Sequence, residues 1–188
     1  LALKACSTTI QPYQEAASGT QEKYNSDYSN ASSRISITSS GASPLQISLT
    51  RDMPTASAGQ NVQLTASARS GGQAVGYPGG GSPVVITAAI PAETRYTAGS
   101  ASAQVPAQIQ YSSNNGQSWN PSQPTDPTTV THLRWILAGA VDSSPDQVSF
   151  GVTLDANYSG APIRARADGG LLDAGALTSA EAVINDSN

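Results

Sequence analysis

Charged residues are scarce in this sequence, and their scarcity excludes one class of partner. Asp, Glu, Lys and Arg make up 12% of the 188 residues, about half the usual share of ~25%. The only lysines are Lys4 and Lys23, and the formal net charge is -4. Nucleic-acid-binding proteins need cations clustered on one face or along one element. The sequence therefore predicts no nucleic-acid partner.

Disulfides and long apolar runs are also missing. Cys6 is the only cysteine, so no disulfide can form within the chain. No run of about 18 apolar residues occurs, which predicts that no segment crosses a membrane. The chain starts at Leu1 rather than Met, which favours either an exported chain without its signal or a fragment. Because Ser, Thr, Gln, Asn and Gly take the place of charges, we expect an extracellular or cell-surface location.

Groups that could perform catalysis are few. His132 is the only histidine, and the sequence pattern puts it on the strand face opposite Trp135. No Ser–His–Asp or Cys–His arrangement can be built around it, since Cys6 lies far away near the N-terminus. A zinc site would need several His or Cys ligands. We therefore expect no catalytic residue, no enzymatic activity and no cofactor.

Carboxylates leave calcium as the one metal to consider. Calcium needs several oxygen ligands that converge on one point, and no Asp-x-Asp-x-Asp-Gly pattern occurs. We interpret the carboxylates near turns as solvated groups and expect no metal site, with calcium kept as the alternative. They are Asp142, Asp146, Asp155, Asp168 and Asp173.

From Arg34 onward, apolar and polar residues alternate in short segments. A period of two is the signature of a half-buried strand. We expect Leu64, Trp135, Phe150 and Val152 to face the core, because each lies on the apolar side of such a segment. The expected strands are residues 34–38, 45–51, 62–68, 84–88, 109–111, 132–137, 148–154, 163–167 and 180–184.

Turn residues separate these segments. Asn114-Asn115-Gly116 predicts a tight hairpin turn, because Asn and Gly tolerate positive φ. Pro121, Pro124 and Pro127 exclude a regular strand or helix between Trp119 and Val130. Many short strands joined by Gly- and Pro-rich turns predict an antiparallel β-sandwich of about seven to nine strands over residues 34–188.

Residues 1–33 differ from the rest and are too polar to form a core of their own. We interpret them as an extended N-terminal arm or assembly segment. Our hypothesis is that residues within 1–40 add a strand to, or clasp, a neighbouring copy; the alternative is a disordered tail or linker. The apolar residues that would make this contact are Leu1, Leu3, Ala5, Ile10, Ile35 and Ile37.

Four segments in order carry a family resemblance, which is clearest over residues 45–156. They are Ala58-Gly59-Gln60-Asn61-Val62-Gln63-Leu64-Thr65, Ile90-Pro91-Ala92-Glu93-Thr94-Arg95-Tyr96-Thr97-Ala98-Gly99-Ser100, the hairpin from Tyr111-Ser112 through Gly116 to Trp119, and the strands Leu133-Arg134-Trp135 and Val148–Leu154. The chain resembles the conserved-repeat cell-surface domain known as domain of unknown function eleven, found in bacterial and archaeal surface proteins. The resemblance implies an Ig-like sandwich and a surface location, and it implies no chemistry. Glu93 departs from the family pattern, which has Gly there.

The predicted function is that of a structural subunit of an extracellular or cell-surface assembly: a filament, pilus-like fibre, tube or S-layer. Its expected partners are copies of itself, with other surface proteins or glycans as further partners. The alternative is an adhesin or a carbohydrate-binding module of a larger surface protein. Aromatic residues that could stack on a sugar are Trp119, Trp135, Tyr77, Tyr96 and Tyr111, although the alternation predicts that Trp135 is core.

Overall fold

The structure, a computed structural model, describes residues 45–76 and 81–187. These residues belong to one compact unit that runs from Ser43 to Asn188. The predictions for the arm, for the strand at residues 34–38 and for the six assembly residues all lie outside the described residues. In the part of the chain that the structure describes, no helix has the length and hydropathy needed to cross a bilayer.

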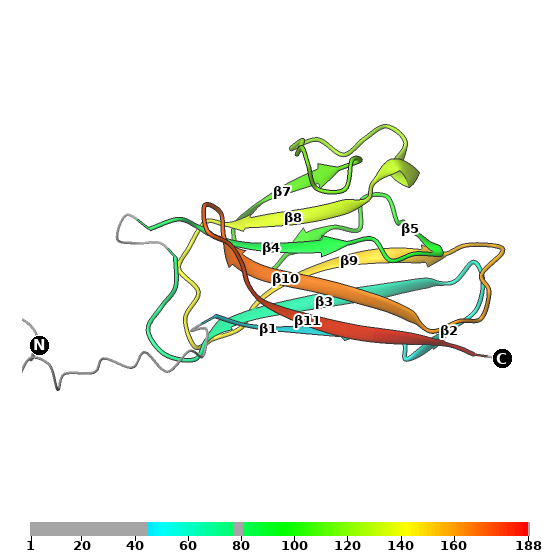
Figure 1. Cartoon of the computed structure of the whole chain (residues 1–188), viewed down its shortest axis with the longest axis horizontal. Coiled ribbons are helices and arrows are strands. Elements are labelled where there is room, and N and C mark those ends of the chain that lie inside the picture. Colours follow the sequence, from blue (N-terminus) through cyan, green and yellow to red (C-terminus); the bar gives the residue numbers. More distant parts are fainter. Residues whose placement is uncertain (1–44, 77–80, 188) are drawn as a thin grey trace, which may run out of the picture. The chain divides into compact units, whose positions relative to one another are not determined.

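The described chain is almost entirely β-structure, as the alternating segments predict (Figure 1). Within the described residues, the one helical element is the 3-10 turn η2 (Pro127–Thr129), which begins in the proline-rich segment and is capped by Asp126. The strands are β1 (Leu45–Arg51), β2 (Thr55–Ala56), β3 (Asn61–Ser70), β4 (Val84–Ala89), β5 (Thr94–Tyr96), β6 (Ser102–Ala103), β7 (Ala107–Ser112), β8 (His132–Leu137), β9 (Asp146–Leu154), β10 (Ile163–Leu171) and β11 (Gly175–Asp186).

The strands form two sheets that pack face to face, so the predicted β-sandwich is confirmed. The five-stranded sheet has the order β1-β3-β9-β5, with β6 also paired to β9, and the six-stranded sheet has the order β2-β11-β10-β4-β8-β7. All pairs are antiparallel except β2 with β11, which is parallel. That pair arises because the chain leaves the first sheet after β1 and joins the second sheet through β2.

The strand order is Ig-like. In an Ig domain, strands A, B, E and D form one sheet and C, F and G form the other. Here β1, β3, β9 and β5 hold the A, B, E and D positions, and β4, β10 and β11 hold C, F and G. The departure is the β7–β8 hairpin, which is inserted between β5 and β9 and widens the second sheet beside β4.

The core lies between the two sheets and consists largely of small aliphatic side chains. Leu64, Trp135, Phe150 and Val152 are all at most 1% exposed. Trp135 of β8 packs against Phe150 of β9 with their ring centroids 5.8 Å apart, which joins the two sheets through two of the three largest side chains of the core. Alanine fills much of the remaining interface: Ala56, Ala66, Ala68, Ala88, Ala165, Ala167 and Ala182 are buried.

Close approach of β1 to β10 requires a glycine. A Cβ atom at Gly169 of β10 would lie 2.3 Å from Cγ1 of Ile47 and 3.3 Å from Cδ2 of Leu45. Because interiors are close-packed, Ile47 occupies the volume that a side chain at position 169 would need. The register of β10 against β11 shifts between Gly169 and Gly170, so this is also where the strand bulges.

The family-like turn after Pro91 takes a conformation that explains why glycine is usual there. Glu93 has a φ of 59°, in the left-handed region that glycine adopts at no steric cost. Its carboxylate accepts hydrogen bonds from the hydroxyl of Ser159 at 2.8 Å and from the amide of Ser159 at 3.3 Å. These contacts with the β9–β10 connection help to compensate for the strained backbone.

Candidate functional site

The outer face of the five-stranded sheet is a nearly uncharged array of hydroxyl and amide groups, which we call the hydroxyl face. In one cross-strand row, Thr50 lies opposite Thr65, Thr65 opposite Ser149 and Ser149 opposite Ser102. The next row joins Ser48, Ser67 and Gln147. The remaining members are Gln46, Asn61, Gln63, Arg69, Arg95, Thr97, Ser100 and Thr153.

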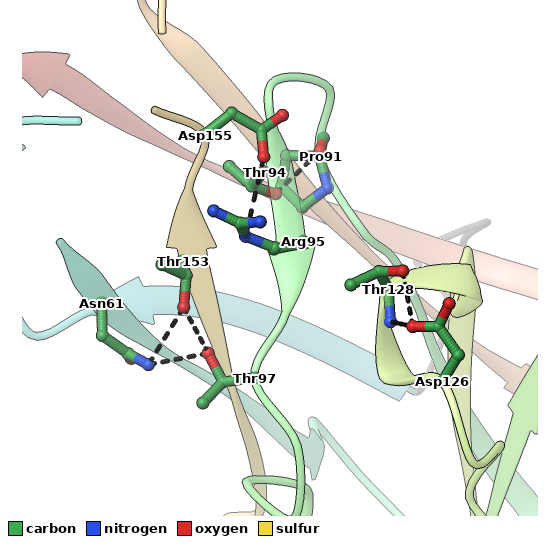
Figure 2. Close-up of polar contacts among 9 residues, drawn as sticks. All are labelled: Asn61, Pro91, Thr94, Arg95, Thr97, Asp126, Thr128, Thr153 and Asp155. Atoms are coloured by element: carbon green, nitrogen blue, oxygen red, sulfur yellow. Dashed lines mark hydrogen bonds and ion pairs between the residues drawn. The ribbon is translucent and has the colours of Figure 1, made fainter. Parts of the chain in front are cut away.

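Hydrogen bonds within the hydroxyl face satisfy its polar groups locally. Figure 2 shows Asn61, Thr97 and Thr153 in one cluster: Asn61 Nδ2 donates to Thr97 Oγ1 at 2.7 Å, and the two threonine hydroxyl oxygens lie 3.0 Å apart. Ser100 Oγ accepts from Gly151 N at 2.8 Å and donates to Thr97 O at 2.6 Å. Because these groups bond one another, the face offers few unsatisfied donors to a ligand.

The outer face of the six-stranded sheet also carries a hollow, and unlike the hollow over Gln46, Ser67 and Arg69 on the hydroxyl face it is walled by an aromatic ring. A hollow of about 210 Å³ lies over β4, β8, β10 and β11. Its floor is made of small or apolar residues: Val85, Gly170 and Ala176. The full lining is Val85, Thr87, Trp119, Arg134, Asp168, Gly170, Leu171, Leu172 and Ala176.

Arg134 is the cation of this hollow. Its Nε donates to Oε1 of Gln110 on the neighbouring strand at 2.6 Å, and its guanidinium carbon lies 4.5 Å from the ring centroid of Trp119. Burial lowers the pKa of Arg134 below its ordinary value, and an arginine in a protein stays charged at neutral pH all the same. Within the described residues no hydrogen bond or ion pair engages its two terminal amino groups.

Register places a hydroxyl and a carboxylate beside this cation. Arg134 lies opposite Thr87, and Thr87 lies opposite Asp168. Oδ1 of Asp168 accepts from Nε of Arg166 at 2.9 Å, while the hydroxyl of Thr87 has no bonding partner among the described residues. A cation, a hydroxyl and a carboxylate therefore follow one another across three adjacent strands.

Trp119 is held over the face by the loop that precedes it. Asn115 and Gly116 both have positive φ, at 58° and 77°, as the sequence predicts for this turn. A Cβ at Gly116 would lie 3.5 Å from the Trp119 ring and 3.8 Å from His132. Trp119 lies over the outer face beside Arg134, and its neighbour Asn120 pairs with the edge strand at Tyr111.

The remaining sequence candidates do not form a second site. His132 lies on the outer face opposite Trp135, and its Nδ1 is buried without a hydrogen-bond partner in the described residues. Burial lowers the pKa of His132, an effect that the nearby Asp168 partly offsets. Tyr96 is buried and packs edge-on against Tyr111, with ring centroids 6.0 Å apart. Of the aromatic candidates within the described residues, only Trp119 and Tyr111 are half exposed; Tyr77 lies outside them.

The carboxylates considered for calcium do not converge. Across residues 45–76 and 81–187, no three His, Cys, Asp or Glu gather in a metal-ligating group. Asp155 pairs with Arg95 at 3.8 Å (Figure 2), and Asp173 accepts a hydrogen bond from Ser82. Asp146 is close enough to Asp142 that burial and this neighbour together raise the pKa of Asp146.

The sheet edges are the second feature that bears on function. Within the described residues, three edges are interrupted or only partly covered: β2 pairs with Asn185 and Asp186 alone, which leaves the rest of β11 bonded to β10 only, β5 and β6 are separated by a loop, and β7 meets Asn120 at Tyr111 alone. The fourth edge is β1, which spans seven residues. Within the described residues only β3 pairs with β1.

A hydrogen bond just after the C-terminal end of β1 shows which residues of β1 bond to β3 and which point away from it. Asp52 N donates to Gln63 O, so by antiparallel alternation Thr50, Ser48 and Gln46 bond toward β3. The N–H and C=O groups of the intervening residues, Ile47 and Leu49 among them, consequently point away from β3. They form an edge that can accept another strand.

Comparison with known proteins gives likeness of fold only. No known family model matches the chain, and no curated protein matches its sequence. A putative membrane-anchored protein from Corynebacterium diphtheriae superimposes with a TM-score of 0.48 at 13% identity, covering 81% of this chain and 38% of that one. The C-terminal domain of the Streptococcus pyogenes antigen I/II-family protein AspA gives 0.48 at 8% identity, covering 78% and 53%.

The collagen-binding domain of a Staphylococcus aureus adhesin gives a TM-score of 0.46 at 10% identity, covering 77% of this chain and all of that domain. The chain spans well under two thirds of the length of the Corynebacterium protein, at 38%. Likenesses with TM-scores below 0.5 carry no argument about function. The function therefore has to be inferred from the residues of this chain itself.

Proposed function

We propose that this chain is a non-enzymatic structural module of an extracellular or cell-surface assembly, built by strand addition at β1. The observation that carries the proposal is the β1 edge, seven residues long, which within the described residues pairs with β3 alone and directs the N–H and C=O groups of Ile47 and Leu49 outward. Long open edges are rare in proteins that remain monomeric, because they template pairing with another chain.

Composition supports export and self-association. Charge is scarce over the whole chain, and the hydroxyl face has mostly hydroxyl and amide groups, with Arg69 and Arg95 as its cations. The resemblance to conserved-repeat surface domains points to the same location. The comparison with Ig-like folds adds nothing about activity, since such folds host many unrelated functions.

The strand donor that we propose is a segment within residues 1–40 of a neighbouring copy. Its apolar candidates remain Leu1, Leu3, Ala5, Ile10, Ile35 and Ile37, all outside the described residues. Head-to-tail donation of this kind repeats without closing and gives an open filament. Folding of the same segment onto its own β1 would give a monomer, so the state of assembly distinguishes the two.

A matched pair of substitutions at Ile47 tests the edge. Both Ile47→Pro and Ile47→Ala remove the side chain that packs over Gly169, but only proline removes the outward N–H and places its ring at the edge. Proline is tolerated on edge strands. We expect the intact chain and Ile47→Ala to form polymers in negative-stain micrographs, and Ile47→Pro and a chain lacking residues 1–40 to remain monodisperse.

Three outcomes would contradict the proposal. If the intact chain stays monodisperse at concentrations that cover the microscopy grid with particles, the chain does not self-assemble. Polymers that form equally well from Ile47→Pro would show that β1 is not the acceptor, and polymers from the truncated chain would show that the arm is not the donor. Circular dichroism of each variant confirms that the sandwich is folded before assembly is scored.

A further inference from the structure

The residues that line the hollow on the six-stranded sheet take no part in the proposed strand addition at β1. It is smaller than the ~300–1,000 Å³ of pockets that bury a drug-sized molecule, at about 210 Å³. A hollow of this size accommodates one ring-sized unit and leaves the rest of a longer ligand in solvent. It belongs to a single copy of the chain, so an inference from it is independent of assembly.

The charge in the hollow selects an anion. Arg134 is half-buried, and its Nε is already engaged by Gln110, which leaves the two terminal amino groups as a fork. Stacking on Trp119 at 4.5 Å fixes the plane of that fork. A partly desolvated cation without an acidic partner is costly, and a ligand carboxylate that accepts two hydrogen bonds from the fork would relieve that cost.

The other polar groups select hydroxyls and limit the ligand charge. The hydroxyl of Thr87 lies between Arg134 and Asp168 in the same cross-strand row. Neighbouring strands are about 4.8 Å apart. Because β4 lies between their strands, the backbones of Asp168 and Arg134 are roughly 10 Å apart across the sheet. Asp168 can accept from a ligand hydroxyl, and its negative charge disfavours a dianion such as phosphate in the same space.

Backbone pairing argues against a peptide. The hollow lies over the paired interior of the sheet, where β8, β4, β10 and β11 bond one another. Peptide recognition by strand addition needs unpaired backbone groups, and β8, β4 and β10, which supply most of the lining, are paired on both sides. The apolar floor of Val85 and Ala176, with Leu172 exposed at the rim, instead suits the C–H face of a sugar ring.

We propose that this hollow binds a carboxylate-bearing sugar, one hexuronic acid residue of a glycan, with its carboxylate on Arg134 and its hydroxyls toward Thr87 and Asp168. The combination of a fork donor, a hydroxyl, an acceptor and a small apolar floor matches such a ring and no simpler ion. Its Trp119 wall also borders a second, more polar hollow beside the 113–125 loop, which gives a neighbouring sugar of the chain space to continue.

The chain provides its own control. Arg69 on the hydroxyl face is held by Gln46 in the same way, Nε to Oε1 at 2.9 Å, and Arg69→Gln removes the same charge as Arg134→Gln. We would titrate the intact chain, at concentrations where it is monomeric, with oligomers of galacturonate, mannuronate and glucuronate–N-acetylglucosamine. The fully methyl-esterified galacturonate oligomer and a short acidic peptide complete the set.

We expect at least one uronate oligomer to bind by calorimetry, with its methyl ester at least about tenfold weaker, since a charge-assisted bidentate pair is lost. Arg134→Gln should weaken binding at least about tenfold, Trp119→Ala should weaken it too, and Arg69→Gln should leave it within about twofold. Binding of none of the three uronates would overturn the proposal. So would equal binding of the ester, an equal loss in Arg69→Gln, or binding of the acidic peptide in preference to every saccharide.

Discussion

Each outer face of the sandwich has a cross-strand pair of an arginine and a glutamine, but the surfaces around the two pairs differ. On each face, an arginine on an inner strand donates to a glutamine on the neighbouring edge strand: Arg69 to Gln46 at 2.9 Å, and Arg134 to Gln110 at 2.6 Å. Arg69 is exposed, whereas Arg134 is half-buried beneath Trp119. A loop that folds back over a sheet therefore turns an ordinary surface pair into a candidate site.

The faces also differ in how tightly their neighbours pack. On the hydroxyl face, the loop between β5 and β6 lies against Gly151, where a Cβ would be 3.1 Å from Asn61 Oδ1 and 3.2 Å from Ser100 Cβ. On the opposite face, Gly170 lines the open floor of the hollow. The hydroxyl face is therefore closed by its own loop around Gly151, and its hollow lies elsewhere, over Gln46, Ser67 and Arg69. The hollow at Gly170 is the one walled by the Trp119 ring.

Crowding on the hydroxyl face gives the largest expected effect. Gly151→Val should lower the free energy of unfolding by about 1–3 kcal/mol, because the new side chain must displace Ser100 or Asn61. Thr87→Val, the control on the hollowed face, should change it by less than about 1 kcal/mol, since the Thr87 hydroxyl has no partner to lose among the described residues. Urea unfolding measures both. Equal losses would mean that the two faces are equally packed.

The stability of the loop between β5 and β6 on the hydroxyl face should depend on the hydroxyl of Ser100. Ser100→Ala removes the acceptor of Gly151 N and the donor to Thr97 O, and we expect a loss of about 1 kcal/mol in urea unfolding. Ser102 is exposed and its hydroxyl bonds that of Ser149, so Ser102→Ala should cost less than about 0.5 kcal/mol. A loss at Ser102 as large as that at Ser100 would contradict the difference we assign to burial.

Acid should destabilise the hollowed face in particular, through His132. Burial holds the folded-state pKa of His132 below its ordinary value of 6.5, so protonation favours the unfolded chain. The stability that neutral His132 allows is fully present above pH 6.5 and is lost as pH falls toward the folded-state pKa. The melting temperature of the wild type should drop relative to that of His132→Gln between pH 7.5 and 5. If the melting temperatures of the two proteins change in parallel with pH, His132 is exposed to solvent in the folded state.

Substitution of the two arginines should have the smallest effects on the stability of the ligand-free protein. Arg69→Gln should change the free energy of unfolding by less than about 0.5 kcal/mol, as exposed substitutions usually do. Arg134→Gln should cost about 0.5–1 kcal/mol more, because it also removes the contact with the Trp119 ring. A loss of several kcal/mol at Arg134 would mean that this residue is structural, and the binding test would then need Trp119→Ala as its main variant.

Much of the fold could be predicted from alternation. The segment predicted at residues 45–51 coincides with β1, and that at 132–137 coincides with β8. The short strands β2, β5 and β6 carry no readable period, since two or three residues cannot show one. The parallel pairing of β2 with β11 was also unpredictable, because it depends on the chain changing sheets after β1.

The candidate hollow was beyond sequence reasoning for a related reason. Trp119 was noticed as an aromatic residue, but Arg134 was seen only as the middle of a strand motif. Thr87 and Asp168 are 81 positions apart in the sequence, and only the pairing of β4 with β10 makes them neighbours. A clue did exist in the alternation, which places Arg134 on the outward side of its strand beside the buried Trp135.

The sequence by itself determined that this chain forms strands and which side chains of each strand face inward, because a period of two fixes the two faces of any strand. It also determined that charge is scarce and that His132 is the only histidine. The tertiary structure alone decided which strands lie side by side, that β1 has a free edge within the described residues, and that Trp119 covers Arg134. Strand order and loop path depend on packing between distant segments, and local alternation contains no information about either.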